Sequence, residues 1–488
     1  ALPVNFRTRA SMKMSCPIFW TAWTDSMSEK NRILHFAHGM GSYNNSLRVL
    51  ARRLRGAGFQ LCVASHVDLS GVLEGLGVRF EHLQQDRVIA DRRLQAIDAL
   101  QGGNTFKLLA RQIRISRTHR QDSVAMTEVA DLVHDWKPDL LLIDMECHVA
   151  MIQTRKLGIP TVMSSRWFTV FRSGSVPPLH TTLAPPENIL GSLRVRAAWA
   201  RLMLRKWQQD LGQRFSRRRF RTIRYDSNAR SELRAIAAHN GVSLKDIADP
   251  SHWLIPHVYR DIPVMSLTAR ELEFELADDP RMHYVGSMVP GDNDHEPLTP
   301  RIEFQQFVER RESTGNPLVY CSYSTCWDTG SQNIQPLLDL FTKRQDLDMV
   351  IGLGGKTRSK ASAGLPDNIL VMDYAPQLEV LDKAAVAITH GGISTINEAL
   401  HKGVPLIVCS AGHVDQNGCM LRLVHHRAGV AGRSDPIDPA ELERLIDDLL
   451  GEPGVETRAR VAEIQDCLHR YDKNQSAVTF LRSILNDR

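Results

Sequence analysis

The sequence predicts an α/β fold of two doubly wound parallel-sheet domains that face each other across a cleft. Its 488 residues, 43% of them hydrophobic, supply enough apolar side chains for two or three packed cores. Short apolar runs of strand length alternate with segments of helical spacing, first near the N-terminus and again in the second half. A polar stretch with Pro and Gly at 287–300 separates the two series and predicts a linker. A ligand is expected between such domains, because doubly wound sheets bind ligands at the carboxyl ends of their strands.

The first series begins with a strand, a helix and a second strand, which together form a βαβ unit. The apolar run 33–37 ends in a Gly-rich turn, residues at helical spacing follow at 47–54, and a second apolar run occupies 59–64. The same order recurs between the apolar runs 138–144 and 158–163. A parallel sheet covered by helices is the simplest interpretation of this repeated unit.

The second series predicts five further strands, at 317–322, 347–353, 368–372, 385–389 and 405–409. The predicted boundaries are therefore 32–286 for the N-terminal domain and 301–488 for the C-terminal domain, whose last helix could pack back on the first domain. Residues 1–31 show no usable pattern and are left as an unassigned N-terminal extension.

Composition excludes several classes of protein. The chain has 60 Lys and Arg against 55 Asp and Glu, a formal charge of +5, and 24% charged residues, which is ordinary for a globular protein and excludes wholesale disorder. No apolar run approaches the roughly 18 to 20 residues of a membrane-spanning helix. The eight cysteines are scattered, unlike a disulfide framework or a zinc ribbon, so we expect reduced thiols in a cytoplasmic protein.

Positive charge is concentrated at 194–224, which holds eleven basic residues and one acid. Apolar residues recur there at every fourth position: Val195, Trp199, Met203, Trp207, Leu211 and Phe215. One interpretation is a core-packed helix with a solvated basic face. The alternatives are attraction of an anionic acceptor and peripheral contact with an anionic membrane surface. No RNA- or DNA-binding module accompanies the charge, so nucleic acid is not expected as a partner.

The most specific stretch of sequence is a strand end followed by two glycines and the start of a helix. The strand ends at Thr389-His390, and Gly391-Gly392 allow the backbone to turn tightly. The helix that follows begins with exposed backbone N–H groups, which form an anion site suited to a phosphate. His390 can donate a hydrogen bond to a phosphate oxygen.

Residues on both sides of this turn could complete a nucleotide site. Hydroxyls of Ser394 and Thr395 can donate from the first helical turn, Tyr374 offers a flat face for a base, and Glu398 can accept from a pair of ribose hydroxyls. Two structural alternatives need no ligand. Thr395 and Glu398 have the spacing of a capping box, and Tyr374 could be a packing residue at a strand edge.

The chain contains five motifs in order, Tyr-Ala-Pro-Gln at 374–377, His-Gly-Gly at 390–392, Ser-Thr-x-x-Glu at 394–398, Gly-Val-Pro at 403–405 and Asp-Gln at 415–416. This set resembles the GT-B glycosyltransferases of the UDP-glycosyltransferase (GT1) type, a family that includes plant natural-product enzymes and bacterial antibiotic and macrolide enzymes. The resemblance is strong over 368–429 and extends by domain order over 32–488. It implies GT-B architecture, in which two Rossmann-like domains hold the acceptor on the N-terminal side and the nucleotide sugar on the C-terminal side.

The resemblance also implies roles for individual donor-binding residues. Tyr374 would stack on the nucleobase, and the backbone of Gln377 would contact the edge of the base. The pyrophosphate would contact His390, Gly392 and Ser394-Thr395, and the ribose would contact Glu398. The sugar hydroxyls would contact Asp415-Gln416, a pair that is displaced by one residue in the preceding loop. Thr325 matches a further phosphate contact, because 322–325 lies where the family often has Ser-Phe-Gly-Ser.

The chain departs from the family at the catalytic base. Relatives have Gly-His-x-x-Pro or Gly-Asp-x-x-Pro after the first strand, whereas 41–45 is Gly-Ser-Tyr-Asn-Asn, so Ser42 occupies the position of the base. A hydroxyl cannot act as a general base near pH 7 unless it is itself activated. Three explanations are open. His38 takes the role, with Asp144 where relatives keep the orienting acid; Asp144 is itself the base; or the acceptor arrives ionised and needs none.

No metal or cofactor is expected. The turn Gly39-Met40-Gly41 has Asn44 in the place of the third glycine of a dinucleotide fingerprint, which argues against NAD. The resemblance implies that a helix dipole and side chains stabilise the leaving diphosphate, a role that a cation fills elsewhere. The sequence thus predicts an inverting, metal-independent glycosyltransferase that moves a sugar from a UDP- or TDP-sugar to a small-molecule or lipid-like acceptor. A nucleotide-sugar epimerase of the same architecture and a non-catalytic nucleotide-sugar-binding relative are the alternatives.

Overall fold

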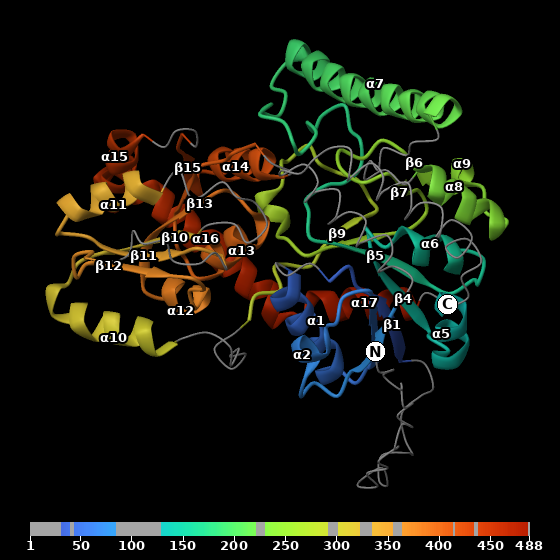
Figure 1. Cartoon of the computed structure of the whole chain (residues 1–488), viewed down its shortest axis with the longest axis horizontal. Coiled ribbons are helices and arrows are strands. Elements are labelled where there is room, and N and C mark those ends of the chain that lie inside the picture. The colour runs from blue at the N-terminus through green and yellow to red at the C-terminus, as the bar shows by residue number, and fades with distance from the viewer. Residues whose placement is uncertain are drawn as a thin grey trace, which may run out of the picture.

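The computed structural model contains two α/β domains side by side (Figure 1). It describes residues 31–39, 43–83, 128–220, 230–290, 301–322, 334–354, 364–412, 415–433 and 438–486, and the side chains of 209–232 and 301 lie outside the description. Residues 291–300 of the expected linker and most of the N-terminal extension also lie outside the described residues.

A seven-stranded parallel sheet forms the centre of the N-terminal domain, in the order β3-β2-β1-β4-β5-β8-β9. Its strands are β1 (Arg32–Phe36), β2 (Gln60–Ser65), β3 (Arg79–His82), β4 (Leu140–Asp144), β5 (Thr161–Ser165), β8 (Val264–Ser266) and β9 (Met282–Tyr284). Strands β6 (Ala248–Asp249) and β7 (Val258–Tyr259) form a separate antiparallel pair. Every residue of β4 is buried, as expected for a central strand covered by helices on both faces.

A six-stranded parallel sheet forms the centre of the C-terminal domain, in the order β12-β11-β10-β13-β14-β15. Its strands are β10 (Leu318–Ser322), β11 (Asp348–Gly352), β12 (Ile369–Met372), β13 (Ala384–Thr389), β14 (Leu406–Val408) and β15 (Gly429–Ala431). Counted within the domain, this is the doubly wound order in which a ligand binds where the strand order reverses. The reversal lies between β10 and β13 here, and between β1 and β4 in the first domain.

Helices cover both sheets. Those of the first domain are α1 (Asn44–Gly56), α2 (Ser70–Leu73), α5 (Glu128–Trp136), α6 (His148–Thr154), α7 (Ile189–Phe220), α8 (Arg230–His239), α9 (Leu244–Ile247) and the 3₁₀ turn η2 (Arg270–Leu272). Those of the second are α10 (Arg301–Arg311), η3 (Glu312–Thr314), α11 (Ile334–Lys343), α12 (Gln377–Leu381), α13 (Ile393–His401), α14 (Gln416–His425), α15 (Pro439–Leu450), η5 (Glu452–Gly454), α16 (Val455–Lys473) and α17 (Ser476–Asn486). The sequence sets these limits locally: α15 starts with Pro439, and the Asp438 carboxylate accepts from the backbone N–H of Ala440.

All the strands expected from the sequence are present, each within a few residues of its predicted limits. The β6–β7 pair was not predicted, nor were β3, β8, β9 and β15 of the two parallel sheets. Strand β3 is only partly buried, and each of the other three has three residues, so neither length nor a continuous apolar run distinguishes them from loops.

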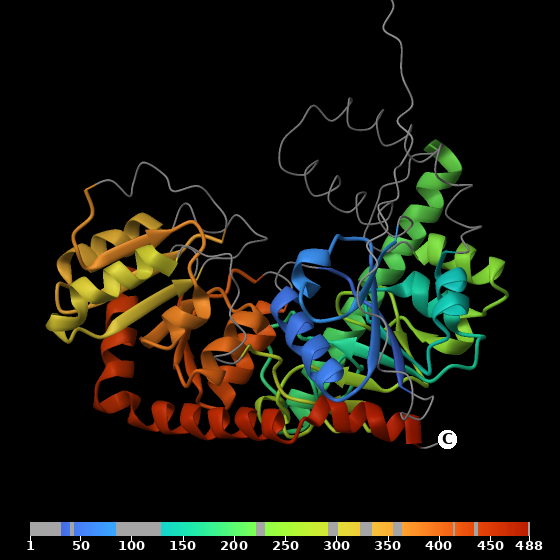
Figure 2. The ribbon, with the colours of Figure 1, turned by 90° about the horizontal axis from the view of Figure 1, so that it is seen from below.

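The C-terminal helices join the two domains (Figure 2). Helix α16 packs against α13, and α17 packs against α1 of the first domain. Ala477, Val478 and Leu481 of α17 are buried in the apolar cluster that contains the inner face of α1. Arg482 donates to the carbonyl oxygen of Ala57 at 2.7 Å. Helix α17 therefore completes the core of the N-terminal domain.

Most of the basic segment lies in α7. The packing of this helix shows that the residues of the four-residue apolar repeat do not share one buried face. Val195 and Trp199 are buried, but Trp207 is 58% exposed. Each step of four residues advances about 40° too far around an α-helix, so after three steps Trp207 has turned about 120° away from Val195. Lys206 is buried instead. Leu211 and Phe215 lie beyond the described side chains.

The six described cysteines form no disulfide: they are Cys62, Cys147, Cys321, Cys409, Cys419 and Cys467. Burial raises the pKa of most of these thiols, for example Cys62 to about 12, so they are protonated and chemically quiet near neutral pH. Among the described helices, none has the length and apolar character needed to cross a membrane.

Candidate active site

The turn between β13 and α13 forms the centre of the candidate donor site. Gly391 has a φ of 94°, and a Cβ atom there would crowd Val408. Gly392 is the N-cap of α13 and has no side chain with which to cap the helix. A Cβ atom on Gly392 would overlap the His390 ring, so this glycine lets the imidazole lie against the helix terminus. A helix terminus with a histidine beside it suits a phosphate group.

The capping-box alternative for Thr395 and Glu398 is wrong. Helix α13 begins at Ile393, so Thr395 lies within the helix and does not occupy its N-cap position. Both side chains are buried on the inner side of the helix. The helix start is consequently free of the side-chain cap that this alternative requires.

The side chain of Gln377 links several candidate donor residues. Its amide Nε2 donates to the Glu398 carboxylate and lies 3.5 Å from Thr395 Oγ1. Its Oε1 accepts from Tyr320 Oη and Ser322 Oγ, both at 3.0 Å. This network holds the first residue of α12 against α13 and β10. The base-contacting turn and the ribose acid that the resemblance implies are thereby held in a fixed relation.

Tyr374 follows β12 and is 57% exposed. An aromatic ring exposed to this degree does not fit the alternative of a packing residue at a strand edge. Exposed aromatic faces are suited to stacking on a planar ligand. The side chain therefore has the environment that a nucleobase platform requires.

Asp415 and Gln416 lie at the start of α14, both buried. Burial raises the pKa of Asp415 to about 6, against the opposite effects of its backbone hydrogen bond and of the Arg166 charge. Arg166 follows β5 of the first domain, whereas Asp415 belongs to the second. The candidate sugar-binding acid is therefore close enough to the first domain for charges there to act on it.

Replacing Asp415 with Asn is expected to remove a pH-dependent component of folding stability. The carboxyl holds its proton more tightly in the folded protein, so the free energy of unfolding falls as pH rises from the ordinary pKa of 3.8 to about 6. The shift corresponds to about 3 kcal/mol across this window. Thermal unfolding across these pH values should show wild type losing stability relative to Asp415→Asn, and parallel curves would contradict the assignment.

A second polar cluster lies at the carboxyl end of the first sheet, where the strand order reverses. His38 follows β1 and Glu146 follows β4, and His38 Nε2 lies 3.2 Å from Glu146 Oε2. The other carboxylate oxygen, Glu146 Oε1, lies 2.8 Å from a guanidinium nitrogen of Arg166. Glu146 therefore bridges the histidine and the arginine.

Asp144 occupies a different place in this cluster from the one expected. Its Oδ1 accepts from the backbone N–H of Glu146 at 3.0 Å, and burial raises its pKa, which the Arg166 charge opposes. The carboxylate that His38 contacts is that of Glu146, which no sequence motif had indicated. The available signal was a second acid two residues beyond the end of a buried strand. Ser42, like Thr325 of the donor set, lies outside the described residues.

This arrangement can act as a general base. A carboxylate that orients an imidazole also stabilises the imidazolium formed when the ring takes a proton. A buried carboxylate with a raised pKa, such as Asp144, would also be a base candidate. The described cluster thus supports two of the three explanations for the missing family base, namely that His38 is the base or that Asp144 is the base.

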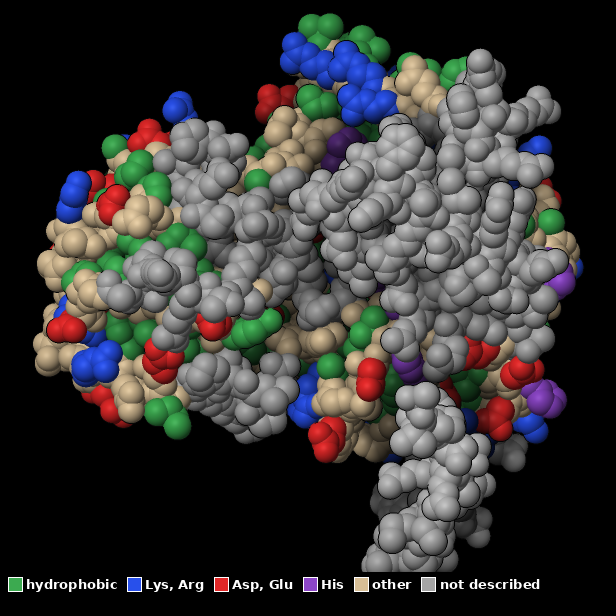
Figure 3. Space-filling model, viewed as in Figure 1, with side chains coloured by type: hydrophobic (Ala, Val, Ile, Leu, Met, Phe, Trp, Pro, Cys, Tyr) green, Lys and Arg blue, Asp and Glu red, His purple; other side chains and the backbone are tan. Residues whose placement is uncertain are grey.

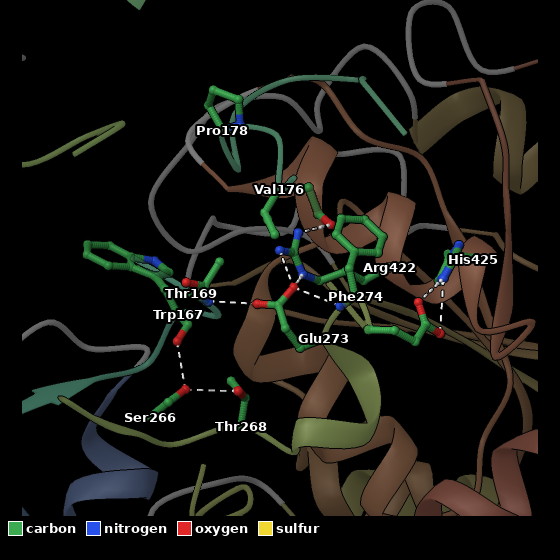
Figure 4. Close-up of polar contacts among 12 residues, drawn as sticks. Trp167, Thr169, Val176, Pro178, Ser266, Thr268, Glu273, Phe274, Arg422 and His425 are labelled. Atoms are coloured by element: carbon green, nitrogen blue, oxygen red, sulfur yellow. Dashed lines mark hydrogen bonds and ion pairs between the residues drawn. The ribbon is translucent and has the colours of Figure 1, made fainter. Parts of the chain in front are cut away.

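An ion pair between the domains fixes α14 (Figure 4). The guanidinium of Arg422 in α14 lies 2.5 Å from the carboxylate of Glu273, which follows η2 of the first domain, and both side chains are buried. Glu273 also accepts from the backbone N–H of Thr169 at 2.7 Å. The ring centroids of Phe168 and Phe274 lie 4.6 Å and 4.4 Å from the guanidinium carbon of Arg422. The charges are therefore paired, hydrogen-bonded and covered by aromatic faces.

The same helix makes a close backbone contact with the first domain. A Cβ atom on Gly418 would collide with the carbonyl oxygen of Leu179, and Asn417 Nδ2 donates to the carbonyl of His180 at 3.3 Å. Asp415 and Gln416 start this helix. The candidate sugar-binding residues are thus held by a helix that is anchored to the opposite domain.

One group of three possible metal ligands occurs in the described part of the chain. Side-chain atoms of Glu275, His425 and His426 lie within 4.8 Å of one another. His425 bonds to the Glu275 carboxylate at 3.0 Å, and His426 bonds to the carbonyl oxygen of Glu273 at 2.9 Å. These contacts account for the three side chains as hydrogen-bonding partners across the domain interface.

Comparison with known families matches residues 337–467 to the model described as "Erythromycin biosynthesis protein CIII-like, C-terminal domain". A curated relative from Bacillus subtilis (strain 168), an uncharacterized UDP-glucosyltransferase, is 31% identical over 30% of this chain and 38% of its own length. The demethyllactenocin mycarosyltransferase of Streptomyces fradiae is 33% identical over 26% of this chain, which aligns with a quarter of that protein. The 4'-demethylrebeccamycin synthase of Lentzea aerocolonigenes is 23% identical over 74% of this chain and 77% of its own.

Solved structures match over almost the whole chain. The glycotransferase of kitacinnamycin has a TM-score of 0.63 at 17% identity and covers 94% of this chain and 100% of its own. The glycosyltransferase VinC, solved with dTDP, has a TM-score of 0.59 at 18% identity with the same coverage. The expected GT-B fold is confirmed by these likenesses, and the resemblance to antibiotic and UDP-dependent glycosyltransferases is confirmed by the relatives.

Proposed function

We propose that this chain, which has the GT-B glycosyltransferase fold and an EryCIII-like C-terminal domain, transfers a sugar from a UDP- or TDP-sugar to a small-molecule or lipid-like acceptor. The observation that carries the proposal is the start of α13, whose N-cap is Gly392 and which lies beside His390 at the strand-order reversal of the second sheet. Tyr374 supplies an exposed aromatic face after β12, three strands from β13 in the same sheet. These features suit a nucleoside diphosphate, with the base on the tyrosine and the phosphates at the helix terminus.

In this mechanism, His38 takes the proton from the acceptor hydroxyl while Glu146 orients the ring. The acceptor oxygen attacks the anomeric carbon of the donor, and the bond from that carbon to the diphosphate breaks. A single displacement of this kind inverts the configuration at the anomeric carbon. The positive end of the α13 dipole and His390 stabilise the departing diphosphate, so the proposed reaction is metal-independent.

The proteins found in the comparisons include users of both pyrimidine nucleotides. VinC and the spinosyn rhamnosyltransferase SpnG are each solved with thymidine diphosphate, whereas the Bacillus relative is named for UDP. Both nucleotides are pyrimidine diphosphates and would use the same stacking face. The acceptor would occupy the first domain, next to His38.

Selective stabilisation by UDP or TDP is the expected result of a thermal-shift panel that also contains GDP, ADP and NAD. A ligand at 100 times its dissociation constant stabilises the folded protein by about 2.7 kcal/mol. The His390→Ala variant should lose most of this stabilisation, and turnover of wild type should survive EDTA. No response to any nucleotide, or an unchanged response in His390→Ala, would overturn the donor assignment.

Incubation with nucleotide sugar alone separates transfer from epimerisation. An epimerase changes the sugar of the donor without an acceptor, whereas a transferase leaves the donor intact or hydrolyses it slowly. A protein that binds TDP but gives no product with any acceptor would support the non-catalytic alternative.

A further inference from the structure

Helix α7 has a second apolar stripe on the side away from the protein. The stripe is formed by residues spaced alternately three and four apart, namely Leu190, Leu193, Ala197, Ala200, Leu204 and Trp207. All six are exposed, and the four large ones have exposed fractions between 52% and 68%. This spacing places them along one face of an α-helix. A soluble surface helix normally has a single apolar face, directed to the core.

The opposite face of α7 is already used to attach the helix. Val195 and Trp199 are buried, and Trp199 Nε1 donates to the carbonyl oxygen of Val176 at 2.9 Å. The buried Lys206 ammonium donates to the carbonyl oxygens of Pro250, at 3.0 Å, and of His252. Rotation of the helix to bury the outer stripe would break these contacts. The outer stripe therefore stays at the surface, along the outer edge of the first domain (Figure 1).

Arginines line both sides of this stripe. Arg194, Arg201 and Arg205 lie on one side and Arg196 on the other, and all four are exposed. No Asp or Glu occurs between Ile189 and Gln208. Figure 3 shows the mixture of hydrophobic and basic side chains over α7 at the top of the molecule.

We propose that the outer face of α7 docks the protein on an anionic lipid surface. An apolar stripe between arginines matches the acyl boundary and the anionic headgroups of a bilayer leaflet, in which a helix lies parallel to the surface. A second copy of α7 fits less well, because pairing of two stripes would bring arginines of one helix against arginines of the other. Docking places the first domain, which holds the acceptor in the proposed function, beside the membrane.

Vesicle flotation with the full-length protein tests the proposal. Wild type should float with vesicles of phosphatidylcholine and phosphatidylglycerol at low salt, and stay at the bottom with phosphatidylcholine alone or at high salt. Two variants should each reduce the bound fraction by about tenfold or more. One is Leu204→Gln with Trp207→Gln, and the other is Arg194→Gln with Arg201→Gln and Arg205→Gln. Because every altered side chain is exposed, the folded structure should persist, which circular dichroism and thermal unfolding check.

A matched control removes three exposed arginines from the second domain by Arg427→Gln, Arg433→Gln and Arg444→Gln. This variant loses the same net charge and should bind vesicles like wild type. Equal flotation of the α7 variants and wild type would overturn the proposal. A protein that is dimeric in light scattering, and monomeric after Leu204→Gln with Trp207→Gln, would also overturn it in favour of a second copy. The His390→Ala variant should still float, so failure of docking and failure of donor binding are distinguishable.

Discussion

Replacing His38 with Ala is expected to lower kcat by about 10²- to 10⁴-fold, the range that a positioned general base contributes. The imidazole lies at the end of β1, held by the Glu146 carboxylate at 3.2 Å, at the strand-order reversal of the acceptor-side sheet. Dissociation constants for UDP or TDP should change little, because the donor residues belong to the other domain. The measurement is kcat and KM for each substrate, together with nucleotide affinity by calorimetry.

Three control variants test the role of His38. Glu146→Gln retains a hydrogen-bonding partner but removes the negative charge that stabilises the imidazolium, so kcat should also fall. Asp144→Asn should be milder if His38 is the base, and Ser42→Ala should be mild as well. A folded His38→Ala variant with nearly normal kcat would refute the dyad. A greater loss of kcat in Asp144→Asn than in His38→Ala would identify the Asp144 carboxylate as the base. Full activity in both variants would leave the explanation that the acceptor arrives ionised and needs no base.

Replacing Arg422 with Met is expected to destabilise the protein by about 3 to 5 kcal/mol, since removal of one partner leaves a buried charge without its counterion. Glu273 would keep the hydrogen bond from the Thr169 N–H but lose both contacts from the guanidinium. The attraction of the cation to Phe168 and Phe274 would be lost as well. The expected result is a large fall in the thermal midpoint and separation of the unfolding transitions of the two domains.

The double variant Arg422→Met with Glu273→Gln should recover much of the stability, because no charge is then left buried. Arg427→Met is the matched control, since Arg427 lies at the end of the same segment with an exposed side chain and should change stability by less than about 1 kcal/mol. Equal effects at the two arginines would show that the buried pair has no special place in the interface. Loss of donor affinity in Arg422→Met would further indicate that the anchor of α14 positions Asp415.

The fold and the donor motif could be predicted because both are encoded by neighbouring residues. A parallel strand buried on both faces is a continuous apolar run, and the two glycines before α13 mark a turn that side chains would block. The short strands β8, β9 and β15 could not be predicted. Three residues carry too little pattern, and the pairing partners of these strands determine them.

The contacts of the base cluster could not be predicted for a different reason. His38 and Glu146 are more than a hundred positions apart, and only the order of β1 and β4 brings them together. The family resemblance implied Asp144 as the orienting acid, but the loop after β4 directs the acid two positions later to the histidine. The Arg422–Glu273 pair spans a similar separation and left no local signal.

The position of α17 has a consequence for the order in which the protein can fold during synthesis. The N-terminal domain ends its sheet at Tyr284, yet its core needs the apolar side chains of α17, which begin at Ala477, about 190 residues later. At roughly 5 to 20 residues per second, the ribosome needs on the order of 10 to 40 seconds to make that stretch. The core of the first domain therefore remains incomplete, with its α1 side uncovered, until the second domain and α17 have been translated. Chaperones that shield apolar surfaces would find their target on the half of the protein that is made first.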